Sequence, residues 1–289
     1  MHNFKRWEDL TFTDDFMFSQ VMKNKEICKE VIETILGIKV GKIEFLTSQH
    51  EIQIDPEAKT IAMDVYLRDE KKIINVEMQT GHRLELPKRS RYYQAASDID
   101  NTPPSGLYSE MRDNYVIFIC TFDPFLHGKA FYKFENICLN EDEPLYLNDG
   151  TYKIFLNTSA KDLTLLDREL KLFYDYICNG EIDSRLTKRI DSSITKIKED
   201  RETRRKYMTY TTRMAEAKSE AREEGIKYGI AVGEERGRNE GIAIGEKLGE
   251  ERGRNEAKLE TAKTLLAFGD SIEKVSKVTG LSVEEIEKL

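Results

Sequence analysis

The sequence predicts an α/β fold, a mixed β-sheet flanked by helices, followed by a long helical C-terminal region. Up to about residue 182, strand-like segments alternate with amphipathic helical segments. One of them, residues 115–122, is almost wholly apolar, as in a strand that is covered on both faces. Beyond residue 183 the chain is highly charged and has hardly any aromatic residues, which favours an exposed helix.

The N-terminal segment favours two helices. Capping-type residues at 13–15 (Thr-Asp-Asp) precede apolar residues spaced for one helix face, so a helix is expected to begin there. A second helix is expected over residues 25–36, because Gly37 stands in the usual stop position.

The segments that follow define the sheet. Three strands are expected, at residues 42–48, 60–67 and 73–79, and a short turn joins the last two as an antiparallel hairpin. Pro87 suits the first turn of a helix that runs to about residue 99. The remaining expected elements are the apolar strand at 115–122, strands at 130–135 and 152–156, and a helix at 162–178.

Polar residues interrupt the predicted hairpin where core residues should dominate. Alternation along its second strand places Asn75, Glu77 and Gln79 on one face and apolar residues on the other. Asp64 lies in the middle of the first strand. Two carboxylates in such positions cost desolvation energy unless something compensates them. A divalent cation would do so, since Mg²⁺ is typically held by one or two carboxylates, substrate phosphates and water.

Asp64, followed across the hairpin by Glu77-Met78-Gln79, resembles the PD-(D/E)XK nuclease motif in its D…ExQ form. The order helix–strand–strand–strand–helix–strand agrees with that restriction-endonuclease-like fold. Residues 5–180 more specifically resemble the recombination-promoting nucleases of bacteria, the PD-(D/E)XK nuclease family transposases. The matching segments are 14–18 (DDFMF), 64–66 (DVY), 76–79 (VEMQ), 88–93 (KRSRYY), 115–120 (YVIFIC), 123–125 (DPF) and 153–157 (KIFLN).

The resemblance implies a metal-dependent DNA endonuclease of mobile-element or defence systems, which hydrolyses phosphodiester bonds. Asp64 and Glu77 would hold the metal, Mg²⁺ or alternatively Mn²⁺ or Ca²⁺, with the Met78 carbonyl as third ligand. The metal would polarise the phosphate and lower the pKa of a bound water. Gln79 stands where most of the superfamily has a lysine; it can hydrogen-bond the water but supplies no positive charge. Asp64, Glu77 and Gln79 are therefore the expected catalytic residues.

The helix after the hairpin is expected to contact substrate phosphates. Arg89 can bind a phosphate with two N–H groups at once. Lys88 and Arg91 add positive charge, and Tyr92 lies about one helical turn from Arg89.

Several of these residues also have a purely structural interpretation. Asp64 and Glu77 could form an ion pair with Arg89 instead of binding a metal. Asp15, or its neighbour Asp14, is an accessory acid that would reach the metal from the first helix, but helix capping explains either residue equally well.

Composition favours a cytoplasmic protein. The four cysteines are scattered, the N-terminal residues form no apolar signal segment, and no apolar run reaches the roughly 18 residues of a membrane span. We therefore expect reduced thiols and no membrane partner. The net charge of −8 argues against bulk attraction of nucleic acid, although a local basic groove is compatible with it.

A non-catalytic role is the alternative to the endonuclease. The missing lysine and the acidic balance favour a decayed nuclease-fold scaffold that acts as an oligomerising interaction protein. A third interpretation is cleavage of RNA instead of DNA. The resemblance also implies regulation by the protein's own C-terminal fragment, for which Met208 or Met214 could serve as the start.

A glycine repeat marks the C-terminal region. Glycine recurs at every fourth position from Gly225 to Gly253. Eight helical glycines would cost about 6–8 kcal/mol relative to alanine. Either the segment is a mobile tether, or close approach of a second copy recovers that cost, and homo-oligomerisation is the favoured interpretation. The expected parts are a nuclease-like domain at 1–182, a charged helical connector at 183–222, the glycine repeat at 223–256 and a small helical segment at 257–289.

Overall fold

The computed structural model describes residues 4–52, 61–81, 84–139 and 143–289. The chain divides into two compact units, Met1–Thr211 and Thr212–Leu289. The described residues of the first unit form the strands β1 (Phe45–Ile52), β2 (Ile61–Arg68), β3 (Lys72–Gln79), β4 (Asp113–Cys120), β5 (Phe131–Phe134), β6 (Ile137–Cys138), β7 (Leu145–Tyr146) and β8 (Thr151–Asn157). Its helices are α1 (Asp15–Met22), α2 (Lys25–Leu36), α3 (Leu86–Asn101), α4 (Arg168–Asn179), α5 (Arg185–Glu199) and the first turns of α6 (Arg201–Ala267), with short 3-10 helices at Trp7–Asp9 and Tyr108–Glu110.

Six strands form one mixed sheet in the order β1-β2-β3-β4-β8-β5, and β6 and β7 form a separate two-stranded ribbon. The pairs β1–β2 and β2–β3 are antiparallel, β3–β4 and β4–β8 are parallel, and β5 runs antiparallel to β8. The predicted α/β fold with a mixed sheet is confirmed.

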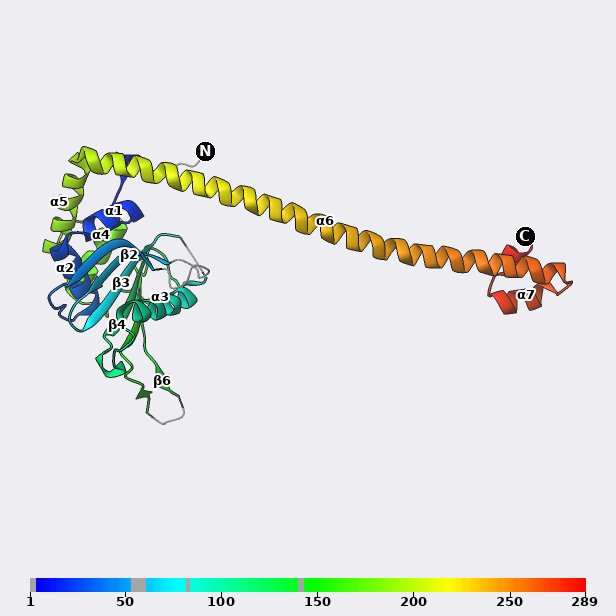
Figure 1. Cartoon of the computed structure of the whole chain (residues 1–289), viewed down its shortest axis with the longest axis horizontal. Helices are drawn as coiled ribbons and strands as arrows, with labels where there is room; N and C mark the ends of the chain where they lie inside the picture. Colours follow the sequence, from blue (N-terminus) through cyan, green and yellow to red (C-terminus); the bar gives the residue numbers. More distant parts are fainter. Residues whose placement is uncertain (1–3, 53–60, 82–83, 140–142) are drawn as a thin grey trace. The chain divides into compact units, whose positions relative to one another are not determined.

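Helices cover both faces of this sheet (Figure 1). On one face, α1, α2, α4 and α5 pack against apolar residues such as Ile74, Val76 and Met78. On the other face, α3 packs through Leu86, Tyr93 and Ala96, and its neighbours include Phe118 and Phe155. Covering on both faces explains why β4 is almost wholly apolar.

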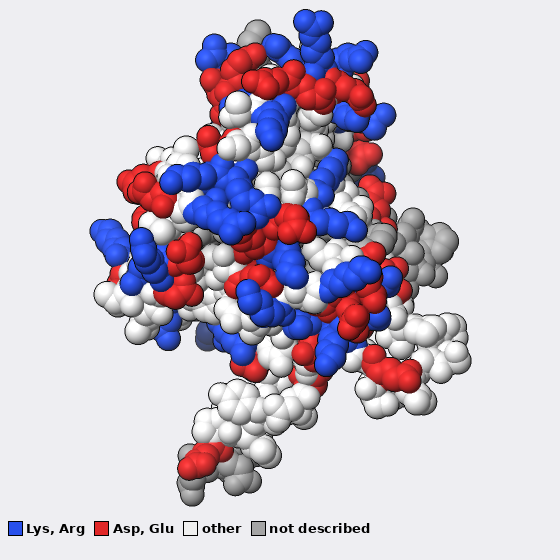
Figure 2. Space-filling view, turned by 90° about the vertical axis from the view of Figure 1, so that its left-hand side faces the viewer, with Lys and Arg blue, Asp and Glu red and all other residues white. Residues whose placement is uncertain are grey.

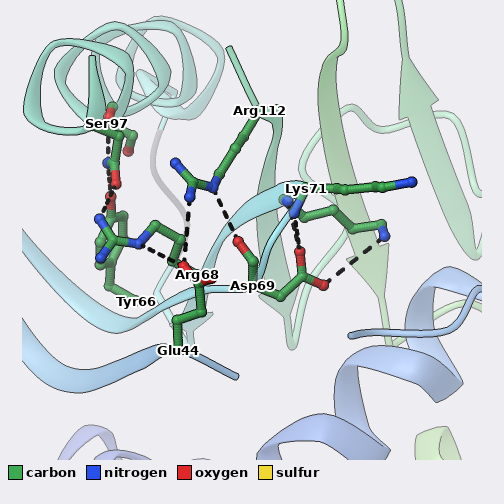
Figure 3. Close-up of polar contacts among 9 residues, drawn as sticks. Glu44, Tyr66, Arg68, Asp69, Lys71, Ser97 and Arg112 are labelled. Carbon is green, nitrogen blue, oxygen red and sulfur yellow. Dashed lines mark hydrogen bonds and ion pairs between the residues drawn. The ribbon is translucent and has the colours of Figure 1, made fainter. Parts of the chain in front are cut away.

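A polar network fixes the closed end of the β2–β3 hairpin (Figure 3). Asp69 is buried, and its carboxylate accepts hydrogen bonds from the N–H groups of Gly41 at 2.8 Å, Lys71 at 2.8 Å and Lys72 at 2.7 Å. Arg112 donates to the Asp69 carbonyl oxygen at 3.0 Å. Because the turn sets the hairpin register, this network determines which residues of β2 and β3 face each other.

Several elements differ from the sequence expectation. Strand β1 spans Phe45–Ile52 instead of residues 42–48, since its pairing with β2 covers that range. Strand β4 spans Asp113–Cys120 instead of residues 115–122, since it pairs with β3 from Asp113 onward. Helix α4 begins at Arg168 instead of residue 162, because Asp167 caps it, accepting from the Leu170 N–H at 2.9 Å. Asp162 instead closes a turn with Thr164. The β6–β7 ribbon was not predicted. Thr60, the expected start of β2, lies outside the described residues.

The first compact unit extends past residue 182. Helix α5 buries Ile190 and Ile194 in the core of this unit. Trp7 donates from Nε1 to the Lys198 carbonyl oxygen at 3.0 Å, and Tyr207 in α6 donates to the Lys5 carbonyl oxygen at 2.6 Å. These contacts join α5 and the first turns of α6 to the domain.

The second unit contains the rest of α6, α7 (Ile272–Thr279) and α8 (Val283–Ile286). Its small core consists of Ala262, Val275, Leu281 and Ile286. The glycine repeat is helical throughout, and a Cβ atom added at any of its eight glycines would meet, beyond its chain neighbours and the adjacent helix backbone, no atom of the described residues within 4 Å. Packing within the described residues therefore does not require these glycines.

Among the residues that the structure describes, no helix combines the length and the apolar character needed to cross a membrane.

Candidate active site

The backbone ladder between β2 and β3 ends before the open end of the hairpin. The two strands are paired as far as Val65 and Val76. Asp64 and Glu77 occupy the next position of this register, while β3 continues to pair with β4 up to Gln79. The two predicted carboxylates, here called the carboxylate pair, thus lie where β2 and β3 stop bonding through their backbones.

Each carboxylate of the pair reaches the backbone of the opposite strand. Glu77 Oε1 accepts a hydrogen bond from the Asp64 N–H at 3.0 Å, and Asp64 Oδ2 accepts one from the Met78 N–H at 3.0 Å. These bonds stand in for the missing ladder bonds and hold the two acids next to each other. The structure therefore brings Asp64, Glu77 and the backbone of Met78 together.

Arg89 of α3 is the cation at this site. Its Nη2 atom lies 2.8 Å from Glu77 Oε2, and its Nε donates to the Tyr93 hydroxyl at 2.6 Å. The guanidinium also lies 4.9 Å from the centre of the Tyr93 ring. The Glu77 side chain has no exposed surface, whereas 22% of the Arg89 side chain is exposed. The ion pair foreseen by the structural interpretation is thus present for Glu77.

The charge around Glu77 remains unbalanced. Burial raises the pKa of Glu77 well above its ordinary value, and repulsion from Asp64 adds to the rise. Arg89 and the Asp64 N–H act in the opposite direction without cancelling this rise. A further positive charge at the carboxylate pair would therefore stabilise the ionised form of Glu77.

The backbone of Gln79 faces β4, whereas the backbone of Met78 faces β2. Gln79 is buried, and its side-chain oxygen lies 3.4 Å from Arg89 Nη1. Its backbone carbonyl accepts from the Thr121 N–H next to β4 at 3.0 Å. Since backbone groups alternate sides along a strand, Met78 presents its backbone toward β2, as its N–H bond to Asp64 already indicates. The Met78 carbonyl is thus on the side of the carboxylate pair.

The other predicted phosphate contacts lie at the surface of α3. Lys88 and Arg91 are exposed, and Tyr92 is 38% exposed, whereas Tyr93 is buried. The positive charges of Lys88 and Arg91 are consequently accessible to a ligand approaching the helix, but they take no part in the buried contacts around Glu77.

The two acids of the first helix have different surroundings. Asp14 accepts from the Thr11 N–H at 2.7 Å and pairs with Lys5 at 2.8 Å, so its carboxylate is engaged at the start of α1. Asp15 is exposed. Asp15 and Asp64 both raise the pKa of Tyr210 in α6, although burial is the larger cause. Asp15 and Asp64 therefore act on the same tyrosine of α6.

Two residues of this site were missed by sequence reasoning. Tyr93 orients Arg89, but a tyrosine on a helix face indicates packing as readily as a site. Asn75 is fully buried, and neither its side-chain oxygen nor its nitrogen has a hydrogen-bond partner among the described residues. An asparagine in mid-strand on the Glu77 face was the available signal.

A charged face lies elsewhere in the first unit. On the side covered by α2 and α5, basic and acidic side chains are interleaved (Figure 2). A groove of about 680 Å³ there is lined by charges of both signs: Lys29, Lys39, Arg168, Arg185 and Arg189 with Glu26, Glu30, Glu33, Asp167 and Glu169. Arg189 pairs with Glu30. The lining of this groove therefore offers no single sign of charge to a polyanion.

The donor set at the carboxylate pair suits a hard divalent cation. Within the described ranges, no group of three or more His, Cys, Asp or Glu residues could hold a metal. Two carboxylates and a backbone carbonyl nevertheless match the way proteins hold Mg²⁺, whose remaining ligands are water and substrate phosphate. The raised pKa of buried Glu77 agrees with a site that is short of positive charge.

Comparison with known proteins identifies the family of the chain and agrees with its fold. No curated protein and no solved structure matches the chain. The family model described as "PD-(D/E)XK nuclease family transposase" matches residues 8–224, which include the whole sheet, the carboxylate pair and Arg89. The chain therefore belongs to the PD-(D/E)XK nuclease family transposases.

Proposed function

We propose that this protein is a divalent-metal-dependent DNA endonuclease whose reaction takes place at the carboxylate pair. The observation that carries the proposal is the approach of Asp64 and Glu77 where the β2–β3 ladder ends, each bonded to the opposite strand at 3.0 Å. A buried glutamate with a raised pKa beside a second acid is an unfavourable arrangement for stability alone. A bound cation would explain this arrangement, because its positive charge would stabilise both carboxylates.

The residues of the site would have three roles: holding the metal, binding the phosphate and attracting the nucleic-acid backbone. Asp64, Glu77 and the Met78 carbonyl would hold the metal. The bound metal supplies Lewis-acid polarisation of the phosphate and a water of lowered pKa. Arg89 compensates Glu77 before metal arrives, and its guanidinium can then turn to a phosphate oxygen. Exposed Lys88 and Arg91 attract the nucleic-acid backbone, and Tyr92 lies beside them on the same helix.

Gln79 would position the attacking water or a phosphate oxygen but would not activate the water. Its amide oxygen already meets Arg89 at 3.4 Å, so its NH₂ group is left to donate to water or phosphate. Because it carries no charge, the proton of the attacking water must pass to solvent, to a carboxylate or to a phosphate oxygen. Asp15 is the accessory acid proposed for this step, since it shares the surroundings of Tyr210 with Asp64.

Cleavage of plasmid DNA tests the proposal. Purified full-length protein is expected to nick or linearise supercoiled plasmid with Mg²⁺ and to lose this activity when EDTA is added. Asp64→Asn and Glu77→Gln should abolish cleavage while circular dichroism remains unchanged. Asp162→Asn, which changes an acid in a distant turn, is the matched control and should cleave as the unaltered protein does.

Cleavage that persists in both site variants would overturn the proposal. RNA offered in place of DNA extends the test, because the 2′-hydroxyl is the group that would let the protein distinguish the two polymers. Preferential hydrolysis of RNA would transfer the same chemistry to the other substrate.

A second candidate function rests on the Glu77–Arg89 ion pair. With Gln79 in place of lysine and Glu77 already paired, the domain could serve as a non-catalytic scaffold. Metal affinity separates the two candidates. An endonuclease should bind Mn²⁺ in calorimetry near neutral pH, and Asp64→Asn should remove that binding; a scaffold should bind none.

We further propose that the partners are DNA, a second copy of the chain and the protein's own C-terminal fragment. The second copy would pack against the helical glycine repeat, where the structure leaves open space at each of the eight glycines. Co-expression of residues 208–289 with the full chain tests the regulatory partner. Reduced plasmid cleavage is expected, and unchanged cleavage would count against it.

A further inference from the structure

A second hollow lies beside α3, away from the carboxylate pair. It has a volume of about 270 Å³, and its lining includes Ser90, Phe125, Phe134, Glu135, Lys153 and Phe155. Its wall is aromatic. The Phe125 ring centre lies 5.0 Å from that of Phe155 and 5.1 Å from that of Phe134. Phe155 is buried, but 43% of Phe134 is exposed, so aromatic surface remains available to a ligand.

The polar groups of this pocket suit a neutral ligand. Lys153 is half-buried, and no hydrogen bond or ion pair joins its ammonium group to another described residue. Burial lowers the pKa of Lys153, while Asp149 and Asp98 act against that fall. Because Asp149 and Asp98 act on Lys153, a phosphate placed there would meet their negative charge as well as the ammonium group, whereas a neutral acceptor would not be repelled. Glu135 in the same lining supplies a hydrogen-bond acceptor.

The pocket lies within reach of a strand bound at the carboxylate pair. In the sheet register, Glu77 is beside Phe118, and Phe118 is beside Phe155. Phe155 is thus two strands from Glu77, about 10 Å away at a strand spacing of about 4.8 Å. That distance corresponds to about three stacked nucleotides. Ser90 of the pocket also directly follows Arg89 on α3.

We propose that this pocket receives one unpaired nucleobase of the substrate strand. The base stacks on Phe134, and Lys153 donates a hydrogen bond to one of its carbonyl or ring-nitrogen acceptors. Every base has a π-face, and stacking on aromatic side chains is the usual way in which proteins hold unpaired bases. The inference rests on the proposed function, because it takes the bound polymer to be the DNA that the carboxylate pair cleaves. It adds a preference for DNA with an unpaired base next to the cut.

Fluorescence of 2-aminopurine tests the pocket without any cleavage. Full-length protein is mixed in EDTA with single-stranded DNA oligonucleotides that each contain one 2-aminopurine at a different position. Stacking should quench the fluorescence at one position more than at the others. Phe134→Ala and Lys153→Met should remove this selective quenching and weaken binding by roughly 5- to 100-fold. Tyr108→Ala and Lys161→Met, at exposed positions outside the pocket, are the matched controls and should change neither.

The outcomes separate this inference from the proposed endonuclease. Plasmid cleavage with Mg²⁺ but no position-selective quenching would overturn the pocket alone. Selective quenching that persists in both pocket variants would show that the base binds outside this pocket, and it would also overturn the proposal. Selective quenching without any cleavage would support the pocket and contradict the endonuclease. Lys153→Met keeps the test valid if Phe134→Ala fails to fold.

Discussion

Glu77 has no solvent-exposed surface, and its Oε2 atom lies 2.8 Å from Nη2 of Arg89. The other carboxylate oxygen accepts from the Asp64 N–H at 3.0 Å. Glu77 thus joins β3 to α3 through Arg89, and it joins β3 to β2 at the open end of the hairpin through the Asp64 N–H. The same contacts make Glu77 central to stability and to the proposed metal binding, and the predictions below separate these two roles.

Loss of the Arg89 guanidinium should destabilise the first unit. Arg89→Met leaves Glu77 buried without its cation, which typically costs about 3–5 kcal/mol, and the partial exposure of Arg89 favours the lower end. Urea unfolding measures the change. Arg91→Met, an exposed arginine on the same helix, is the control and should stay within about 0.5 kcal/mol of the unaltered protein. Equal stability of the two variants would show that the ion pair is not structural.

Stability of the metal-free protein should depend on pH through Glu77. Because the folded-state pKa of Glu77 is raised, the folded protein binds the proton more tightly than the unfolded chain. The free energy of unfolding should therefore fall as pH rises from the ordinary range of glutamate toward the raised pKa, by at most about 1.4 kcal/mol per pH unit. Urea unfolding in EDTA between about pH 5 and pH 8 measures this fall. Glu77→Gln should lack it, and parallel curves for the two proteins would contradict the assignment.

Asn75 should be replaceable without loss of stability. Its buried amide has no hydrogen-bond partner among the described residues, so Asn75→Leu should be neutral or stabilising by about 1 kcal/mol. Asn114→Leu is the contrast, since Asn114 donates to Gln94 and Asp98, and it should lose about 1–3 kcal/mol. A clear loss of stability in Asn75→Leu would mean that the amide is bonded.

Alanine in the glycine repeat should separate helix stability from self-association. Changing Gly229, Gly237 and Gly245 together to alanine should raise helicity, at about 1 kcal/mol per site. If a second copy packs closely against these glycines, the added methyl groups should shift the protein toward monomer in light scattering. Ser219→Ala, on the same helix before the repeat, should leave the assembly unchanged. A wild-type monomer, or unchanged assembly in the glycine variant, would exclude packing through the glycines.

Much of the fold follows from local patterns. Alternation and a short turn predict β2 and β3 within about a residue, and Gly37 ends α2 as expected. The start of α4 was wrong because Asp162 and Asp167 are both capping types, and only the fold selects Asp167. The β6–β7 ribbon is too short to leave a periodic signal.

The site was predicted only in part, because spacing along the chain does not specify partners. The D…ExQ spacing placed Asp64 and Glu77 on neighbouring strands, and the structure brings them together. It could not show that Arg89 would bond to Glu77, since that contact depends on how α3 packs across β3 and β4. The Phe134 and Lys153 pocket likewise arises only when β5 and β8 pair.

A crystal of the full chain soaked in MnCl₂ decides whether the carboxylate pair is a metal site. The anomalous difference map should contain a peak about 2 Å from oxygen atoms of both Asp64 and Glu77, and Arg89 should no longer occupy Glu77 Oε2. A map without that peak, in which Glu77 stays bonded to Arg89 at a saturating Mn²⁺ concentration, would contradict the proposed metal-dependent endonuclease.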